Sequence, residues 1–146
     1  GVGTELVTSR DAPALGGVYK LVEQVVGGQR VGRMKSSPGK VTYPGKKQVY
    51  RKEDSDTFTG DIVAEAKEPP AGIPLLESVM VQGEPTVNFP SVEQIRETTR
   101  EKIAKLPAGV RKGSDPEEYP VLFSGKLEEE RRSLEANLRK ANKETS

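Results

Sequence analysis

The first residues of the chain have the composition of a phosphate-binding turn. Gly1, Gly3 and Thr4 stand close together in the run GVGT. Glycines lack a Cβ, so backbone N–H groups can approach an anion closely, and the threonine hydroxyl adds a donor. Arg10 could bind a phosphate through two parallel hydrogen bonds, with Asp11 orienting its guanidinium. Each signal alone has a simpler explanation, a tight turn for the glycines and a surface ion pair for Arg10 and Asp11.

Lysines are concentrated in the segment that follows. Residues 30–52 carry eight basic side chains and no Asp or Glu. Ahead of them, Lys20 lies on a largely apolar stretch, so its ammonium group needs water, a carboxylate or a ligand. A lysine-protected sheet edge would explain some of these charges but not the complete lack of acids. Small anions such as pyrophosphate need several donors at once, and the candidates in the basic segment are Lys35, Lys40, Lys46 and Lys47.

Nucleic-acid binding is another use for such a segment. Bases stack on aromatic side chains, and only Tyr43 and Tyr50 offer such surfaces here. The segment is also too short to follow much of a phosphate backbone. The alternative function is therefore a freestanding module that binds nucleic acid or another polyanion, with nucleic acid the weaker fit.

Two residue types that carry much enzyme chemistry are absent from the sequence. Without His the chain cannot provide a Ser-His-Asp triad, a histidine metal site or a near-neutral proton shuttle. Without Cys it has no disulfide, thiolate ligand or cysteine nucleophile, which fits a reducing, cytoplasmic location. The acids of residues 53–77 lack the spacing of a calcium loop and are interpreted as solvated surface. We therefore assign no catalytic residue and no metal ligand, and no apolar run is long enough to span a membrane.

The strands that must position the lysines are read from hydrophobic alternation and turn residues. Gly27-Gly28 is a predicted turn, and Pro44-Gly45 should join two strands as a hairpin that carries the lysines. The result is a small antiparallel sheet with a basic hairpin. Strands are predicted over residues 15–26, 34–43, 47–51 and 61–66, with an apolar strand or extended segment over 75–82.

Helices are predicted toward the end of the chain. Ser91, followed three residues later by Gln94, is a capping-box pattern that starts a helix, and Pro107 ends it. A short extended segment over 119–123 precedes a second helix over about 125–142.

The composition is poor for an independent core. Only 33% of the residues are apolar and 5% are aromatic, so the chain can bury one modest layer and should dock on more protein. In the second helix, residues 128–132 are expected to face water. Because the sequence begins at a glycine turn and without Met, we expect an upstream segment of a longer protein.

Three runs of the sequence together resemble the nicotinate phosphoribosyltransferase family. The likeness extends over nearly the whole chain and is strongest in its first third. The runs are GVGTELVTSRDAPALGGVYKLVE (residues 1–23), MKSSPGKVTYPGKKQVYR (34–51) and YPVLFSGKLEEERRSL (119–134).

The resemblance implies the C-terminal portion of a type II phosphoribosyltransferase, with an α+β fold. The end of an α/β barrel, a late strand and loop with the phosphate-binding turn, would occupy residues 1–13. A small antiparallel sheet with the basic hairpin would occupy 14–88, and C-terminal helices 89–146.

The implied reaction joins nicotinate to phosphoribosyl pyrophosphate and yields nicotinate mononucleotide and pyrophosphate, a step that recycles nicotinate into NAD. In this family, ATP hydrolysis is coupled to the reaction through a phosphorylated histidine. The full-length enzyme would use ATP and Mg²⁺, and this chain alone would bind no cofactor completely. The resemblance also implies a homodimer whose site is shared across the interface.

The resemblance gives roles to individual residues. Gly1, Gly3 and Thr4 would lie at the C-terminal end of a barrel strand and hold the 5′-phosphate. Arg10 matches an arginine that reaches phosphates across the dimer interface in related enzymes. The basic positions for pyrophosphate or ATP phosphates would be Lys20, Lys35 and Lys40, with Lys46 and Lys47 as companions.

The other groups that the reaction needs are expected upstream of Gly1. They are the histidine, the carboxylates that face ribose and metal, and the arginine that recognises nicotinate. The chain alone is therefore expected to be inactive.

Overall fold

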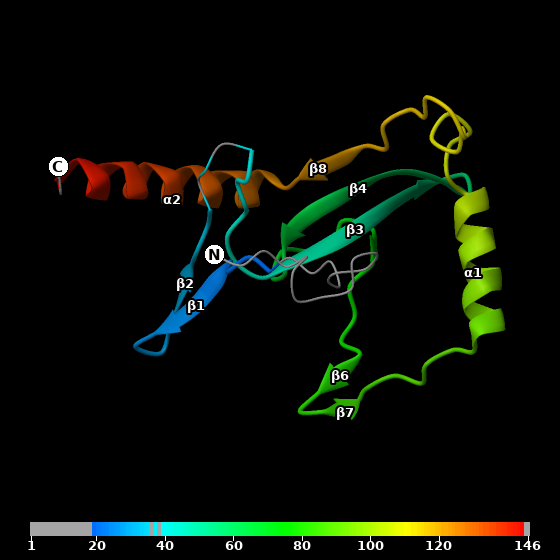
Figure 1. The fold of residues 1–146 in the computed structure, drawn as a ribbon, viewed down its shortest axis with the longest axis horizontal. Helices are drawn as coiled ribbons and strands as arrows, with labels where there is room; N and C mark the ends of the chain where they lie inside the picture. The colour runs from blue at the N-terminus through cyan, green and yellow to red at the C-terminus, as the bar shows by residue number, and fades with distance from the viewer. Residues whose placement is uncertain (1–18, 36, 38, 145–146) are drawn as a thin grey trace, which may run out of the picture.

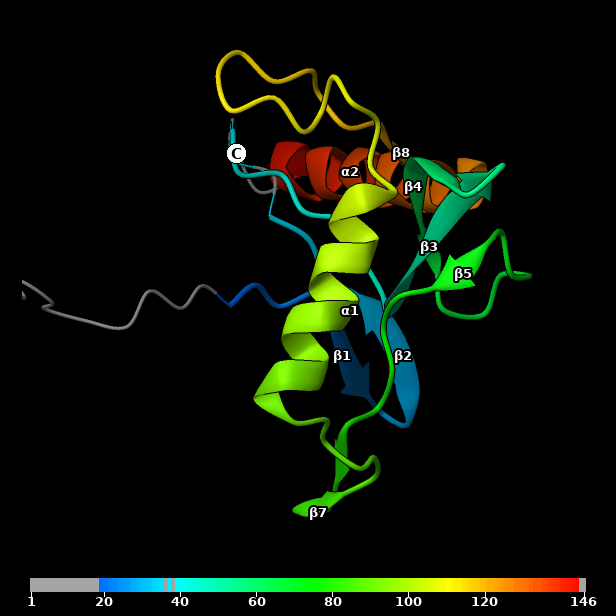
Figure 2. The same cartoon turned by 90° about the vertical axis from the view of Figure 1, so that its right-hand side faces the viewer.

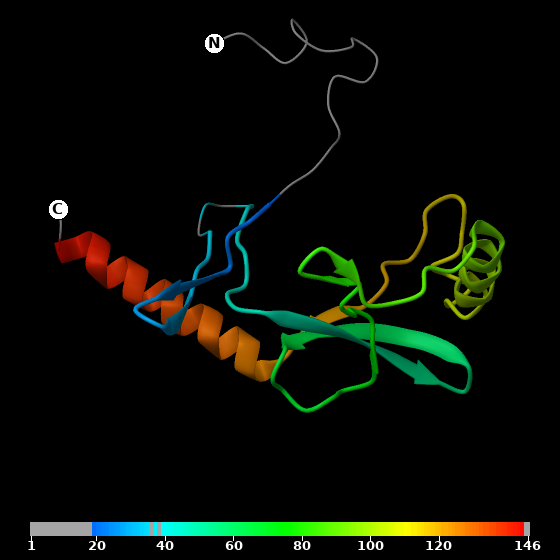
Figure 3. The same cartoon turned by 90° about the horizontal axis from the view of Figure 1, so that it is seen from below.

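The computed structural model describes residues 19–35, 37 and 39–144. Figure 1 shows a central sheet, with helix α2 (Gly125–Glu144) running out from one end and helix α1 (Val92–Ala104) standing at the other. The view from below in Figure 3 shows the same separation of the two helices. The predicted barrel end, with Gly1, Gly3, Thr4 and Arg10, lies outside the described residues.

The central sheet is built on a long hairpin of β3 (Lys47–Asp54) and β4 (Thr57–Glu65). The two strands pair antiparallel from Lys47↔Glu65 to Asp54↔Thr57, with a bulge between Lys52 and Glu53. Ser55 and Asp56 form the two-residue loop, and both have positive φ, as a type I′ hairpin turn requires. The predicted strands over 47–51 and 61–66 are thus confirmed, and the turn between them was not predicted.

Two short strands complete this sheet in the order β5-β3-β4-β8. Strand β5 (Ile73–Pro74) pairs antiparallel with β3. Strand β8 (Val121–Phe123) pairs parallel with β4, so the sheet predicted as a small antiparallel one is mixed at this edge. A parallel neighbour needs a long crossover, and here the crossover includes α1.

A second hairpin precedes the central sheet. Strands β1 (Glu23–Val26) and β2 (Gln29–Gly32) pair antiparallel around the predicted Gly27-Gly28 turn, whose two residues have φ of 56° and 79°. The turn is confirmed. The predicted strand over 15–26 is found only in its last four residues, because residues 19–22 are not in a strand and 15–18 are outside the described part.

The predicted strand over 34–43 is wrong. Its described residues form an irregular loop between β2 and β3 instead. Gly45 has the positive φ expected of a turn glycine, 76°, but Pro44-Gly45 does not join two paired strands. Strand β3 pairs with β4 instead, so Lys35, Lys40 and Lys46 are carried on a loop, and only Lys47, the first residue of β3, lies in a hairpin.

The predicted apolar segment over 75–82 is largely irregular. Only β6 (Met80–Val81) is a strand there, and it pairs with β7 (Glu84–Pro85) around Gln82 and Gly83, which both have positive φ. Figure 2 shows this small hairpin projecting away from the central sheet.

Both predicted helices are confirmed. Ser91 caps α1 through the complete capping box: its side chain accepts from the Gln94 N–H, and the Gln94 side chain accepts from the Ser91 N–H. Lys105 is the C-cap of α1, two residues before Pro107. The second helix begins at Gly125, as expected.

The core is small, as the composition predicts. Among the described residues, Tyr50, Phe58, Ala64 and Leu127 form the buried hydrophobic core, and Pro44 is also buried. In α1, no residue is buried by the described part of the chain, and Val92 is 76% exposed. Neither described helix is apolar enough over a sufficient length to cross a membrane.

Candidate anion-binding site

The predicted lysines lie on and beside one loop, residues 33–47, which we call the basic loop. A single carbonyl oxygen closes its base: Val22 O accepts from the N–H of Arg33 and from the N–H of Gly45, both at 2.8 Å. Pro44 is buried beside Gly32, where an added Cβ would lie 3.0 Å from the Pro44 Cβ. The two ends of the loop are therefore held together against the segment that precedes β1.

A second pair of hydrogen bonds narrows the loop above its base. The Lys35 N–H donates to Thr42 Oγ1 at 2.8 Å, and the Thr42 N–H donates to the Lys35 carbonyl at 3.1 Å. Further out, the Lys40 N–H donates to the Ser37 carbonyl at 3.0 Å. Lys35 and Lys40 are exposed on this outer part of the loop. The structure thus brings these two predicted lysines onto one short, closed segment.

Lys47 points back into the base of the same loop. Its Nζ donates to the carbonyls of Tyr43 at 2.8 Å and Gly45 at 2.7 Å, with Pro44 O at 3.4 Å. Burial lowers the pKa of Lys47, while the charge of Glu23 acts in the opposite direction. The ammonium group therefore cross-links the turn that precedes β3, and anion binding by Lys47 stays a prediction.

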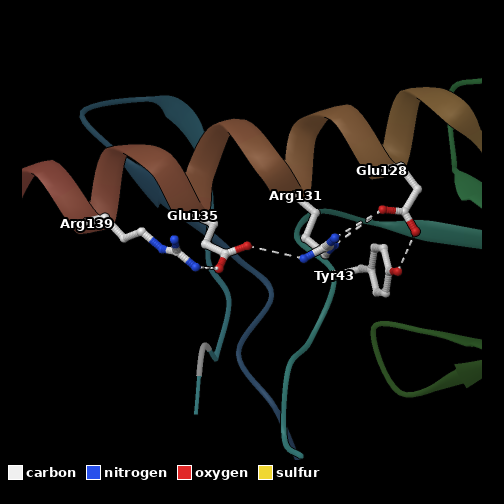
Figure 4. A network of polar contacts seen from close by, with 5 residues as sticks. All are labelled: Tyr43, Glu128, Arg131, Glu135 and Arg139. Carbon is white, nitrogen blue, oxygen red and sulfur yellow. Dashed lines mark hydrogen bonds and ion pairs between the residues drawn. The ribbon is translucent and has the colours of Figure 1, made fainter. Parts of the chain in front are cut away.

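Tyr43 fastens the loop to α2, as Figure 4 shows. Its hydroxyl donates to Glu128 Oε1 at 2.7 Å, and the Arg131 guanidinium carbon lies 5.5 Å from the centre of its ring. Burial, followed by the bond to Glu128, raises the pKa of Tyr43. The same bond is the main cause of a lowered pKa at Glu128.

The Tyr43 ring also stacks on Phe123. The ring centroids are 3.9 Å apart and the planes differ by 8°. Phe123 is the last residue of β8, and α2 begins two residues later. The basic loop is therefore fixed to the junction of β8 and α2, far away in the sequence. These contacts also correct the expectation that residues 128–132 face water, because Glu128 and Arg131 are only 28% and 23% exposed.

Lys46 borders a groove of about 600 Å³ between the first hairpin, the Pro44-Gly45 turn and α2. The sequence predicts a wholly positive field here, but acids from three other elements line the same groove. Two of its basic groups are paired, Arg30 with Glu23 at 2.9 Å and Lys126 with Glu65. The lining charges are Glu23, Arg30, Lys46, Glu65, Lys67, Lys126, Glu129 and Glu130.

Lys20 lies in the exposed segment that precedes β1, so its predicted place within a strand is wrong. Its role in anion binding stays a prediction, as do the roles of Gly1, Gly3, Thr4 and Arg10, which are outside the described residues.

The two tyrosines that could have stacked on nucleic-acid bases are occupied. Tyr50 is 5% exposed in the core, and Tyr43 is held between Phe123 and α2. Neither ring is free to stack on a base, which weakens the nucleic-acid alternative further.

The sequence predicts a solvated surface for the acids of residues 53–77, but at least one of them, Asp61, is buried. Asp61 is 9% exposed and accepts two hydrogen bonds from Arg51, at 2.9 Å and 2.8 Å, and a third from the Tyr119 hydroxyl at 3.1 Å. Arg51 also lies over the Phe58 ring, 4.8 Å from its centre. Arg51 and Asp61 are direct cross-strand partners because of the bulge between Lys52 and Glu53, whereas the Ser55-Asp56 turn alone would have paired Arg51 with Gly60.

The anchors of the basic loop were harder to find from sequence. The carbonyl of Val22 carries no side-chain signal, and Tyr43 and Glu128 are 85 residues apart. Among the described residues, no group of three acidic side chains could hold a metal ion.

Comparison with known proteins assigns this architecture to a class. Residues 72–131 match the family model of the nicotinate phosphoribosyltransferase C-terminal domain. The chain is 41% identical over 129 residues to the nicotinate phosphoribosyltransferase pncB2 of Mycobacterium tuberculosis, a match that covers 87% of this chain and 27% of the relative. With the human nicotinate phosphoribosyltransferase it shares 32% identity over 152 residues, covering 88% of this chain and 28% of the relative.

A solved structure agrees. The crystal structure of human nicotinic acid phosphoribosyltransferase superimposes with a TM-score of 0.67 at 31% identity, covering 83% of this chain and 27% of that chain. The chain belongs to the nicotinate phosphoribosyltransferase family and matches its C-terminal region. The resemblance stated from the sequence is thereby confirmed. The chain spans about a quarter of the length of these relatives.

Proposed function

We propose that the protein forms nicotinate mononucleotide and pyrophosphate from nicotinate and phosphoribosyl pyrophosphate, with coupled ATP hydrolysis, as a salvage step toward NAD. The observation that carries the proposal is the likeness over nearly the whole chain to enzymes of this name, at 41% and 32% identity, together with the shared fold.

In this proposal the chain contributes cationic groups for the phosphates of substrate and ATP. The exposure of Lys35 and Lys40 on the outer part of the basic loop supports that role, because both ammonium groups can reach a ligand without leaving a buried partner. Clamping the pyrophosphate would stabilise its charge as it departs and the ribosyl carbon becomes cationic.

The remaining phosphate contacts of the proposal come from the first part of the chain. Gly1, Gly3 and Thr4 would hold the 5′-phosphate, and Arg10 would reach phosphates across a homodimer interface. Lys20, Lys46 and Lys47 complete the proposed set. A protein of this kind would act in the cytoplasm.

ATP and Mg²⁺ fit the described residues only in part. The basic loop offers positive charge for ATP phosphates, whereas the carboxylates of the described part do not gather as metal ligands. Mg²⁺ would therefore be held by phosphate oxygens and by residues outside this described part. When bound, ATP would supply the free energy that drives the transfer.

The protein encoded by the full reading frame provides the test. Purified enzyme is incubated with labelled nicotinate and phosphoribosyl pyrophosphate, with and without ATP, and the products are separated. We expect nicotinate mononucleotide and pyrophosphate to form, more rapidly with ATP. Nicotinamide replaces nicotinate in a matched reaction. A protein that forms no nucleotide from nicotinate would overturn the proposal.

A further inference from the structure

Tyr43 lies between the Lys35–Thr42 pair and the base of the basic loop, and it makes contacts in three directions. Its hydroxyl is bonded to Glu128 on α2, and its ring stacks on Phe123 at the end of β8. Its carbonyl accepts from Lys47 Nζ at 2.8 Å. One residue thus joins the outer loop, the base of the loop and the β8–α2 junction.

Among the described residues, the other hydrogen bonds of the basic loop lie mostly at its base or within the loop itself. At its base the contacts are between Val22 and the N–H groups of Arg33 and Gly45, and its internal bonds join Lys35 to Thr42. Those bonds fix the shape of the loop but not its direction from the sheet. Tyr43 follows Thr42 directly, so its contacts set where the Lys35–Thr42 pair lies.

The acceptor of the Tyr43 hydroxyl is itself held in place. Arg131 donates to Glu128 Oε2 at 3.3 Å and to Glu135 Oε2 at 3.3 Å, and Arg139 donates to Glu135 Oε1 at 2.6 Å. Figure 4 shows these four side chains in a row along α2. Such i,i+3 and i,i+4 pairs restrict the rotamers of the carboxylate that Tyr43 meets.

We propose that Tyr43 is a positioning residue: by bonding to Glu128 and stacking on Phe123, it holds the basic loop so that Lys35 and Lys40 face the phosphates of phosphoribosyl pyrophosphate or ATP. This inference rests on the proposed function. Tyr43 touches no phosphate itself, because its hydroxyl and ring are both occupied within the chain.

The test uses the intact enzyme and separates binding from turnover. Tyr43→Phe removes the hydroxyl and keeps the stacked ring, and Tyr43→Leu removes both. We expect KM for phosphoribosyl pyrophosphate to rise about threefold in Tyr43→Phe and about tenfold in Tyr43→Leu, from the loss of one charge-assisted hydrogen bond and then of the stack. KM for nicotinate should stay at its wild-type value.

Tyr119→Phe is the matched control. It also removes a part-buried hydroxyl bonded to a carboxylate, that of Asp61, but it lies away from the basic loop. We expect Tyr119→Phe to leave KM for phosphoribosyl pyrophosphate unchanged, even where it lowers the melting temperature as much as Tyr43→Phe does. An equal rise of this KM in both variants would show a general loss of packing and overturn the inference.

A double-mutant cycle tests whether Tyr43 acts through the lysines. In a Lys35→Ala/Lys40→Ala background, Tyr43→Leu should cause no further rise in KM for phosphoribosyl pyrophosphate, since the groups that Tyr43 positions are gone. Full additivity would overturn the inference.

Hydrogen exchange at the Thr42 amide gives a readout that does not need turnover. That amide bonds to the Lys35 carbonyl, and we expect it to exchange faster in Tyr43→Leu than in the wild type. Unchanged exchange would overturn the inference. A wild-type enzyme without activity would overturn the proposed function itself, whereas an active wild type with silent Tyr43 variants would overturn only the positioning role.

Discussion

Arg51 and Asp61 illustrate how much one buried pair contributes to this small sheet. Their side chains are 22% and 11% exposed, and the carboxylate of Asp61 accepts from both Arg51 and Tyr119. The bonds from Arg51 lower the pKa of Asp61, and burial opposes this effect. The same pairing is the main reason that the pKa of Arg51 is raised.

The lowered pKa of Asp61 predicts a particular dependence of stability on pH. The stabilisation by its charge is fully present above the unfolded value, about 3.9, and is lost as pH falls through the lower folded value. We expect Asp61→Asn to reduce the free energy of unfolding by ~2 kcal/mol at neutral pH, because Arg51 loses its partner. Thermal unfolding of both proteins across the acid range measures this difference, which should shrink below about pH 4.

Glu117→Gln is the control for Asp61→Asn. Glu117 pairs with Lys112 at the surface, where the two side chains are 66% and 54% exposed, so its loss should cost less than about 0.5 kcal/mol. A stability difference for Asp61→Asn that stays constant from neutral to acid pH would contradict the conclusion that the charge of Asp61 is what stabilises the fold.

Gly72 stands where β5 approaches β3. Its φ is +152°, and an added Cβ would lie 2.4 Å from the Arg51 carbonyl oxygen. The nearest atoms belong to the Arg51 carbonyl and the Lys52 nitrogen, which are all backbone, so no side chain can move aside. We expect Gly72→Ala to push β5 from β3 and lower the free energy of unfolding by ~2 kcal/mol, as measured by denaturant titration. Gly113→Ala, where a Cβ would meet nothing within 4 Å, should be nearly neutral.

At the scale of the element, α1 depends on its cap more than on its packing. No residue of α1 is buried by the described part of the chain, whereas Ser91 and Gln94 exchange both capping-box bonds. We expect Ser91→Ala to destabilise α1 by ~1 kcal/mol, because an N–H at the helix start loses its acceptor. Hydrogen exchange at the Gln94 amide checks this. Ser91→Asp, which supplies another good acceptor, should restore slow exchange, and equally fast exchange in both variants would exclude the cap as the cause.

The elements that sequence predicted correctly are those with a local cause. Capping residues and Pro107 delimit α1, and two glycines turn the β1–β2 hairpin. The loop over residues 33–47 was mistaken for a hairpin because its lysines and the Pro44-Gly45 pair fit the pattern of two strands and a turn. What decides its structure is distant: the Val22 carbonyl at its base and Glu128 on α2. No periodicity within the loop carries that information.

The electrostatic field of the candidate site also depends on residues that are distant in the sequence. The run of lysines without acids was visible in the sequence, and the exposure of Lys35 and Lys40 agrees with a role in binding. Folding, however, brings Glu23, Glu65 and acids of α2 to the groove beside Lys46. A local net charge is therefore a poor guide to the field around a side chain once distant strands have paired.

At the scale of the whole molecule, apolar surface is widely exposed. Val92 is 76% exposed, Phe89 63% and Met80 56%, in a described part with few buried apolar side chains. In the described part of the chain, exposed large apolar side chains far outnumber buried ones. This agrees with the expectation that the chain docks on further protein, and with relatives of which it spans 27% and 28%.

We predict that residues 1–146, prepared alone, form no nicotinate mononucleotide from nicotinate, phosphoribosyl pyrophosphate and ATP. The prediction rests on the proposed function: the resemblance implies a phosphorylated histidine for the ATP-coupled reaction, and the sequence contains no histidine. The assay follows product by chromatography, with the full-length enzyme as the positive control. Turnover by the isolated chain would show that the missing groups are not needed.

The N–H groups of Arg33 and Gly45 donate to the same Val22 oxygen, so the segment between them can be exchanged for another without moving its two ends. Arg33 and Gly45 leave and rejoin the framework at one atom, each at 2.8 Å, so the distance that a replacement must span does not change with its length. Because the entropy of closing a loop grows slowly with length, a few residues could be inserted between the lysines at a cost below about 1 kcal/mol. Evolution could thereby lengthen or shorten the reach of Lys35 and Lys40 while the sheet and both helices keep their places.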